Sequence, residues 1–143
     1  MAIEGLPTSL KLEIVTPDQA LVTDNVDEVV VPAAEGYLGV LPGHTPLLAT
    51  LAIGEMWYRR GNEKVYLSLA GGFLEVQPDK VTILAQIAER AEDIDVARAE
   101  RAKQRAEERM ARPVMEMDLE RARIALLKSL IRLQVSARAR TRA

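Results

Sequence analysis

Apolar and polar residues alternate along much of the first ninety residues. The clearest example runs from Leu10 to Ile14, where every second residue is apolar and Lys11 and Glu13 lie between them. This two-residue period is typical of a strand with one buried face. The same reasoning predicts short strands over residues 10–14, 20–23, 26–31, 47–51, 55–59, 64–69, 73–76 and 81–88. Strands at this spacing, with no helical pattern between them, predict an antiparallel β-sandwich or flattened barrel over residues 1–90.

Turn-forming residues separate the predicted strands. Thr16-Pro17-Asp18-Gln19 has proline at the second position of a turn, and Pro32 is expected to end the strand that precedes it. Ile53-Gly54 and Gly71-Gly72 are also expected to lie between strands. We interpret Gly71-Gly72 as a hairpin turn, because no lysine and no helix follow it as they would in a phosphate-binding loop. The region contains no nucleophile-elbow, Walker or dinucleotide motif.

The period changes near residue 91. Asp93 and Asp95 are candidate helix N-caps, and an alanine-rich charged segment follows them as far as Arg112, where Pro113 is expected to end the helix. A second helix is expected to begin near residues 116–118. Residues 91–143 are therefore predicted to form an antiparallel two-helix hairpin.

The facing sides of the two predicted helices are complementary at 100° per residue. The first helix offers mainly alanines and the second mainly leucines: Ala99, Ala102, Ala106 and Met110 against Leu119, Ala122, Leu126, Leu130 and Leu133. The second helix also has a further apolar row of Ile124, Leu127 and Ile131. A hairpin of two helices cannot cover both rows, so the further row must pack on the sandwich or on another chain. The hairpin therefore has two alternative packings open to it.

The composition excludes several classes of protein. A hydrophobic content of 48% with 28% charged residues is typical of a soluble globular protein. The absence of cysteine excludes disulfides and thiol chemistry. No apolar run approaches the roughly 18 residues of a membrane span, and the first residues do not resemble a signal peptide. We therefore expect a cytoplasmic protein whose association with a membrane, if any, runs through a partner.

The net charge of −2 conceals a marked asymmetry. Residues 1–92 carry a charge of −7 and residues 93–143 carry +5, with no acidic residue after Glu120. An acidic body with a basic end indicates that the basic end meets a negatively charged partner. Nucleic acid, anionic lipid, nucleotide phosphate and an acidic protein surface all satisfy this criterion.

Residues 35–48 are rich in glycine and proline and contain His44, the only histidine of the chain. Such a segment is expected to fold as strand, tight turn and strand. His44 could in principle act as a general base or a metal ligand. Because no cysteine and no second histidine accompany it, we favour a role in holding the turn or contacting a partner.

The predicted hairpin also carries a cluster of basic residues. These are Arg98, Arg105, Arg109 and Arg112 on one flank of the first helix and Arg121, Lys128 and Arg132 on one face of the second. Clustered like charges favour a multivalent anion. Glu89 and Asp95 lie just upstream and could accept from an adenine amino group, a ribose hydroxyl or an arginine. The alternative interpretation is a set of solvated helix faces with i,i+4 ion pairs.

The glycine-rich segment Glu-Gly-Tyr-Leu-Gly-Val-Leu-Pro-Gly-His-Thr-Pro-Leu-Leu closely resembles the signature of ε subunits of F-type ATP synthases. The resemblance continues through residues 68–76 and 94–99 in the family's order and spacing, and it covers essentially residues 9–135. It implies a non-catalytic subunit of the central stalk, or rotor, with no catalytic residues, no metal and no required cofactor. The sandwich would bind the γ subunit and the c-subunit ring, and so couple proton translocation to ATP synthesis.

The resemblance also implies roles for the hairpin and a location for the protein. The hairpin would be a regulatory arm, which permits turnover when folded on the sandwich and inhibits ATP hydrolysis when extended along γ. The basic C-terminal helix would then meet the catalytic α and β subunits. The expected location is the cytoplasmic face of a bacterial plasma membrane, as a peripheral part of the synthase.

Two groups of site residues follow from the resemblance. Tyr37, Gly43 and His44 correspond to the family's loop that faces the c ring, although family members often carry an acid where Tyr37 stands. The motif Ile94-Asp95-x-x-Arg98-Ala99 matches the one at which some members bind ATP. It implies a regulatory ATP site, for which the candidates are Glu89, Asp95, Arg98, Arg105, Lys128 and Arg132.

Two other classes of function remain as alternatives. A nucleic-acid-binding module would use the basic second helix with Arg138, Arg140 and Arg142, but this end of the chain has no aromatic residue for stacking. A small enzyme or sugar-binding sandwich would use His44 with nearby carboxylates, but it lacks a second catalytic group. We therefore expect neither a nucleic-acid partner nor catalysis.

Overall fold

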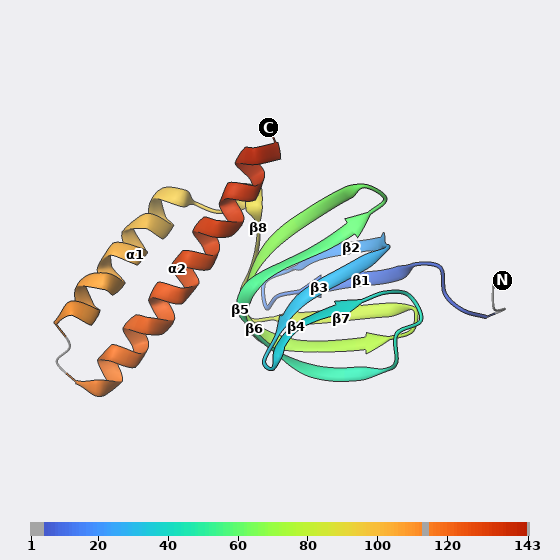
Figure 1. The fold of residues 1–143 in the computed structure, drawn as a ribbon, viewed down its shortest axis with the longest axis horizontal. Coiled ribbons are helices and arrows are strands. Elements are labelled where there is room, and N and C mark those ends of the chain that lie inside the picture. Colours follow the sequence, from blue (N-terminus) through green and yellow to red (C-terminus); the bar gives the residue numbers. More distant parts are fainter. Residues whose placement is uncertain (1–4, 113–114, 143) are drawn as a thin grey trace.

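The computed structural model describes residues 5–112 and 115–142, which form a β-sandwich followed by two helices (Figure 1). The strands are β1 (Leu10–Val15), β2 (Ala20–Val26), β3 (Glu28–Ala33), β4 (Gly36–Val40), β5 (Leu47–Arg60), β6 (Glu63–Gln77), β7 (Lys80–Ala85) and β8 (Ala88–Arg90). A 3₁₀ turn, η1 (Ala91–Asp93), leads into α1 (Val96–Ala111) and α2 (Glu116–Arg142). The predicted fold class, a sandwich followed by a helical hairpin, is confirmed.

The strands form one hydrogen-bonded sheet that curls so that its halves face each other (Figure 1). The order is β2-β1-β7-β6-β5-β3-β4, and β8 pairs with β6. Neighbouring strands are antiparallel except β1 and β7, which run parallel. The alternation of side chains predicts which face of a strand is buried but not the direction of its neighbour, so the parallel pair had no signal in the sequence.

The longest strands, β5 and β6, each replace two predicted strands. They pair along nearly their whole length, from Leu47 opposite Val76 to Arg60 opposite Glu63. The prediction that Gly71-Gly72 forms a hairpin turn is therefore wrong, because both glycines lie inside β6. Gly54, which was expected to separate two strands, lies inside β5.

These glycines mark places where two backbones approach closely. Gly72 has φ of +130°, and a Cβ added to it would lie 2.2 Å from the carbonyl oxygen of Leu84 on β7. A Cβ on Gly54 would lie 2.6 Å from Cβ of Pro32. Glycine is needed at both positions for lack of space, and at Gly72 also for its backbone conformation.

Pro32 does not end its strand as predicted. It is buried inside β3, which continues to Ala33. The register between β3 and β5 shifts between Val30 and Ala33, so the missing N–H of Pro32 falls where the ladder with β5 is already interrupted. Irregularities of this kind are where a sheet tolerates proline.

The sandwich encloses one hydrophobic core built mainly from valine and leucine. Leu10, Leu12 and Ile14 are fully buried, as their alternation predicted. Burial also raises the pKa of Tyr58, whose ring reaches this core. Every buried residue of the core lies between Leu10 and Ala85, so no described residue of the hairpin belongs to it.

The hairpin follows the predicted pattern of small residues. Asp95 caps α1, because its Oδ1 accepts a hydrogen bond of 3.1 Å from the backbone N–H of Arg98. Ala99 and Ala106 of α1 and Ala122 of α2 are buried. Small side chains therefore lie at the helix–helix contact, as predicted. Pro113, which was expected to end the first helix, lies outside the described residues.

Helix α2 lies between α1 and the sheet, so it has two contacting sides (Figure 1). Of its further apolar row, Ile131 packs against the small cluster of Ala91, Ile94 and Val135, whereas Ile124 and Leu127 remain 42% and 44% exposed. Leu130, which was expected to face α1, is 43% exposed. The C-terminal half of α2 is thus the part that contacts the sandwich. Among the described residues, no helix is both long and apolar enough to cross a membrane.

We predict that Gly72→Ala lowers the free energy of unfolding by about 2 kcal/mol more than Gly36→Ala. Gly36 has almost the same φ, +132°, but nothing lies within 4 Å of its added Cβ. Gly36→Ala is therefore the control, because it carries the backbone strain of roughly 1–3 kcal/mol without the collision with β7. Urea denaturation of both variants measures the difference, and equal losses would contradict the close approach of β6 and β7.

Candidate ligand pocket and subunit surfaces

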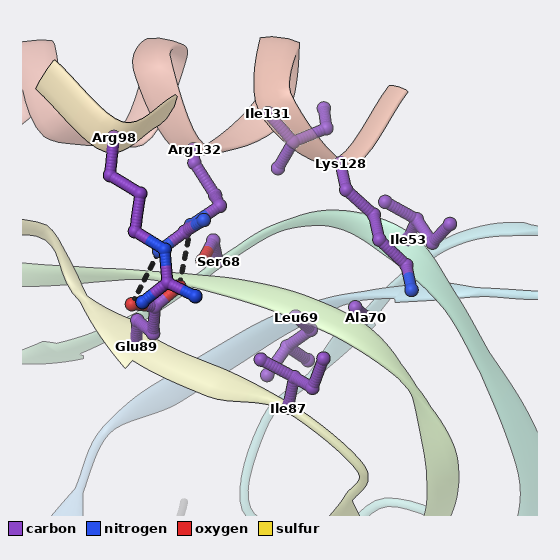
Figure 2. Close-up of a pocket in the computed structure, with 10 residues that line it drawn as sticks. All are labelled: Ile53, Ser68, Leu69, Ala70, Ile87, Glu89, Arg98, Lys128, Ile131 and Arg132. Atoms are coloured by element: carbon purple, nitrogen blue, oxygen red, sulfur yellow. Dashed lines mark hydrogen bonds and ion pairs between the residues drawn. The ribbon is translucent and has the colours of Figure 1, made fainter. Parts of the chain in front are cut away.

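A pocket of about 250 Å³ lies where the helices meet the sheet. It is lined by residues from β5, β6, the segment around β8, α1 and α2: Ile53, Ser68, Leu69, Ala70, Ile87, Glu89, Arg98, Lys128, Ile131 and Arg132 (Figure 2). The pocket brings together residues more than seventy positions apart in the sequence. It exists only while the hairpin is docked on the sandwich.

The pocket has an apolar floor and a charged side. Figure 2 shows Ile87 and Leu69 on the sheet side, with Arg98 and Arg132 extending from the two helices toward Glu89. The charged lining residues are three cations and one carboxylate. The site therefore favours an anionic ligand that also has an apolar part.

Arg132 and Glu89 form a two-point contact inside this pocket. Nε of Arg132 lies 2.7 Å from Oε1 of Glu89, and Nη2 donates a hydrogen bond of 3.0 Å to Oε2. The contact of Nε is an ion pair without a hydrogen bond. Both side chains are only about one quarter exposed, so the pair is screened less than a surface ion pair. An anion that enters the pocket would compete with Glu89 for Arg132.

The structure brings together four of the six predicted ATP-site residues: Glu89, Arg98, Lys128 and Arg132. The other two do not line the pocket. Asp95 caps α1 and so fixes the helix start from which Arg98 projects. Arg105 is exposed on the same flank of α1, about 10 Å beyond Arg98 at 1.5 Å per residue.

Sequence reasoning missed the floor of the pocket. Ile53, Ser68 and Ile87 come from separate segments of the sheet, and each has an ordinary strand-like context. Their meeting depends on the path of β5 and β6, each of which was predicted as two separate strands. The only sign of this floor in the sequence was the further apolar row of the second helix, which the first helix cannot cover. Ile131 of that row lines the pocket.

A second contact lies nearer the end of α2. Arg138 donates two hydrogen bonds to Glu55 of β5, from Nε to Oε2 at 3.2 Å and from Nη2 to Oε1 at 3.0 Å. Its guanidinium carbon also lies 4.8 Å from the centre of the Tyr66 ring. The hydrogen bonds to Glu55 raise the pKa of Arg138 above its usual value. Two basic residues of α2, Arg132 and Arg138, are thus engaged with carboxylates of the sandwich.

A small apolar cluster, here called the seam, lies where the hairpin meets the sandwich, and Tyr66 is its one described member from residues 1–90. Its buried members are Ala91, Ile94 and Val135, and the partly buried residues packed against them are Tyr66, Ile131 and Ala139. The seam is separate from the sandwich core. It lies between the pocket and the contact made by Arg138.

The residues predicted to face a c ring lie at the two ends of β4. Tyr37 is near its start and is 64% exposed, whereas Gly43 and His44 follow its end. Gly43 has φ of +86°, and its N–H donates a 2.7 Å hydrogen bond to the carbonyl of Pro78. Nδ1 of His44 lies 2.7 Å from the carbonyl of Thr45, which supports the turn-holding role. The three residues therefore do not share one loop.

An exposed apolar patch lies on the outer face of β5, β6 and β7. Leu48, Phe73 and Leu84 are 75%, 61% and 52% exposed. Phe73 pairs directly with Leu84 across β6 and β7, and Leu48 lies on the same face of neighbouring β5. Exposed apolar side chains gathered on one face are typical of a protein–protein contact. In the part of the chain that the structure describes, no three metal-ligating side chains come together.

These features define a two-part protein: a sandwich with an exposed apolar face, and a helical hairpin that docks on it around an anion-favouring pocket. Two family models match the chain. The model of the ATP synthase delta/epsilon chain β-sandwich domain matches residues 9–91, and that of the long α-helix domain matches residues 92–137. The chain therefore belongs to the ATP synthase delta/epsilon chain family, and the resemblance to ε subunits is confirmed.

Curated relatives cover almost the whole chain. The ATP synthase epsilon chain of Nitratidesulfovibrio vulgaris (strain DP4) is 48% identical over 131 residues, which are 92% of this chain and 98% of the relative. That of Solibacter usitatus is also 48% identical, over 90% of this chain and 96% of its own length. That of Anoxybacillus flavithermus is 54% identical over 71% of this chain and 76% of its own length.

Solved structures share the fold at low sequence identity. A chain of the Euglena gracilis mitochondrial ATP synthase, in a structure of OSCP, F1 and the c-ring, aligns with a TM-score of 0.80 at 23% identity. The alignment covers 99% of this chain and 86% of that one. A chain of the Tetrahymena thermophila mitochondrial ATP synthase central stalk and c-ring aligns with a TM-score of 0.64 at 11% identity, over 91% and 98% of the two chains.

Proposed function

We propose that this chain is a non-catalytic rotor subunit that couples proton translocation through a c ring to ATP synthesis. In this proposal residues 1–90 bind the γ subunit and the c ring, and residues 91–143 form an arm that inhibits ATP hydrolysis when it leaves the sandwich. The protein would be peripheral, on the cytoplasmic face of a bacterial plasma membrane. Family membership and the solved mitochondrial relatives with a c-ring support this assignment.

The observation that carries the role of the arm is the separation of the two hydrophobic clusters. The sandwich core lies within residues 10–85, and among the described residues the seam has three buried side chains, of which Val135 is fully buried. The hairpin can therefore leave the sandwich without exposing the sandwich core. An arm with two arrangements of comparable free energy can be shifted between them by a ligand or a partner.

Removal of residues 91–143 from the assembled synthase is expected to leave assembly intact and to raise the rate of ATP hydrolysis several-fold, within the range of ordinary allosteric coupling. The truncated chain keeps β8 and the hydrogen bond from Arg90 to the carbonyl of Leu21. Hydrolysis by purified complexes with the full and truncated chain gives the comparison. Equal rates would rule out an inhibitory arm.

The apolar patch on β5, β6 and β7 is the proposed γ-binding surface. Leu48, Phe73 and Leu84 neither belong to the seam nor line the pocket under the hairpin, so γ can be bound in either position of the arm. The turn that contains Gly43 and His44 is the proposed contact with the c ring. Tyr37, at the other end of β4, lines the same cavity as Leu48 of the apolar patch, so the proposal places it on the γ-binding side.

Phe73→Glu is expected to weaken binding of γ at least tenfold, because a charge replaces the centre of the apolar patch and must be desolvated on binding. Leu127→Glu is the matched control, since Leu127 is an exposed leucine on α2. Co-purification of each variant with γ measures the effect. The surface assignment is wrong if both variants bind γ equally well.

The pocket is the proposed site of regulatory ATP. Its apolar floor suits an adenine ring, and Arg98, Lys128 and Arg132 suit phosphates. Its volume is slightly below the roughly 300–1,000 Å³ of pockets that enclose a drug-sized ligand, so only part of a nucleotide would be enclosed. Because the pocket is built by the sheet and both helices, a bound nucleotide would stabilise the docked arm. The carboxylate among its described lining residues, Glu89, is paired with Arg132, so the proposal assigns the site a regulatory role and no hydrolysis.

Calorimetric titration of ATP into the isolated chain is expected to show binding that Arg98→Ala and Arg132→Ala each weaken by at least tenfold, since each loses a charge-assisted contact worth roughly 1.5–3 kcal/mol. Arg101→Ala is the matched control on α1, because Arg101 is exposed and does not line the pocket. Arg105→Ala tests whether the phosphates reach the outer part of α1. Absence of binding at millimolar ATP would leave the arm without a nucleotide sensor.

A further inference from the structure

A carboxylate lies buried on the sandwich outside the proposed ATP pocket. Glu55 is only 7% exposed, on the outer face of β5, where the C-terminal end of α2 covers it. Burying a carboxylate is costly unless it is paired and hydrogen-bonded. Both of its oxygens accept hydrogen bonds from Arg138, so α2 supplies the charge that makes this burial tolerable.

Arg138 is held on two sides. The carboxylate of Glu55 binds its Nε and Nη2, and the ring of Tyr66 lies 4.8 Å from its guanidinium carbon. This arrangement uses the planar guanidinium both as a two-point donor and as a cation over an aromatic ring. Lysine has neither a planar head nor a fork of donors, so it cannot reproduce the contact. The combination fixes the position of the helix end more firmly than a surface ion pair does.

This contact is spatially distinct from the pocket. Glu55, Tyr66 and Arg138 are not among the lining residues, and Arg138 lies about 9 Å beyond Arg132 along the helix axis. Val135 of the seam lies between them on the same side of α2. A ligand in the pocket that takes Arg132 from Glu89 would therefore leave the contact of Arg138 intact.

We propose that Glu55, Tyr66 and Arg138 form a latch that holds the C-terminal end of α2 on the sandwich independently of nucleotide. When α2 leaves, Glu55 and Arg138 both return to water, so the latch stabilises only the docked arrangement. The docked arm thus has two separate restraints, of which one can respond to a ligand and the other cannot. The regulatory consequence of the latch rests on the proposed function of the arm, but its effect on docking does not.

The absence of cysteine in the chain allows a direct test. Val135 is fully buried in the seam, so Val135→Cys introduces a single thiol that a maleimide reaches only when the seam opens. In this background we expect Glu55→Gln and Arg138→Met each to accelerate labelling about tenfold, the effect of losing a charge-assisted contact. The double variant is expected to label no more than about twofold faster than either single variant, because both changes break the same contact.

Two controls separate opening of the seam from other effects. Arg123→Met removes an exposed arginine of α2 that pairs only within its own helix in the contacts described, and it should leave labelling unchanged. A thiol at Val29, in the sandwich core, should remain protected in every variant unless the sandwich itself unfolds. If Glu55→Gln makes the Val29 thiol reactive, that substitution unfolds the sandwich, and Arg138→Met alone then tests the latch. Arg138 is half-exposed at a helix end, so its replacement is not expected to unfold the sandwich. Unchanged labelling in Arg138→Met, or single-variant effects that multiply in the double variant, would overturn the latch.

Addition of ATP distinguishes the latch from the proposed nucleotide site. Millimolar ATP is expected to slow labelling of the Val135→Cys thiol by the same factor with and without the latch substitutions. Arg98→Ala should abolish this slowing and leave the effect of Arg138→Met unchanged. If ATP changes no rate, the nucleotide proposal fails while the latch stands.

Discussion

The pairing of β5 with β6 is the constraint on which the rest of the structure depends. These strands pass through both halves of the sandwich, so they contribute to the core on one face along their whole length. Their outer face has two uses. Near the hairpin end it carries Glu55 and Tyr66, on which α2 docks, and at the other end it carries the exposed apolar patch around Phe73. Gly72 lies between these regions of β6 and lets the backbones of β6 and β7 approach closely.

Charge on the two parts of the protein is complementary where they meet. The sandwich is acidic and the hairpin basic, and two of the carboxylates of the sandwich, Glu55 and Glu89, each bind one arginine of α2. Such pairs determine orientation more than they add to stability, because desolvation offsets much of their attraction. The basic hairpin predicted a negatively charged partner, and part of that negative charge is supplied by the sandwich of the same chain. Lys128 and Arg98 add positive charge to the pocket, where the resemblance implies ATP.

The sequence predicted the fold class and the helix pattern because both depend on local periodicity and on caps. Asp95, Ala99 and Ala106 have the predicted positions. It failed at Gly54 and Gly71-Gly72, because a glycine needed for close approach has the same local signature as a glycine needed for a turn. The arginines of the pocket were identifiable from their helix faces, whereas its floor of Ile53, Ser68 and Ile87 was not. The contact between Glu55 and Arg138 was missed for the same reason, since residues 83 positions apart carry no local signal that they meet.

The composition of the seam bears on whether the proposed movement of the arm is physically reasonable. If the hairpin docked through a large apolar surface, its release would cost roughly 25 cal/mol for every Å² of apolar surface exposed, and the arm would be fixed. The seam instead buries three small or medium side chains, Ala91, Ile94 and Val135, and relies on paired charges around them. Paired charges are well solvated after separation, so they define one docked position without making it irreversible. A surface built in this way is suited to an arm that must dock specifically and still be released.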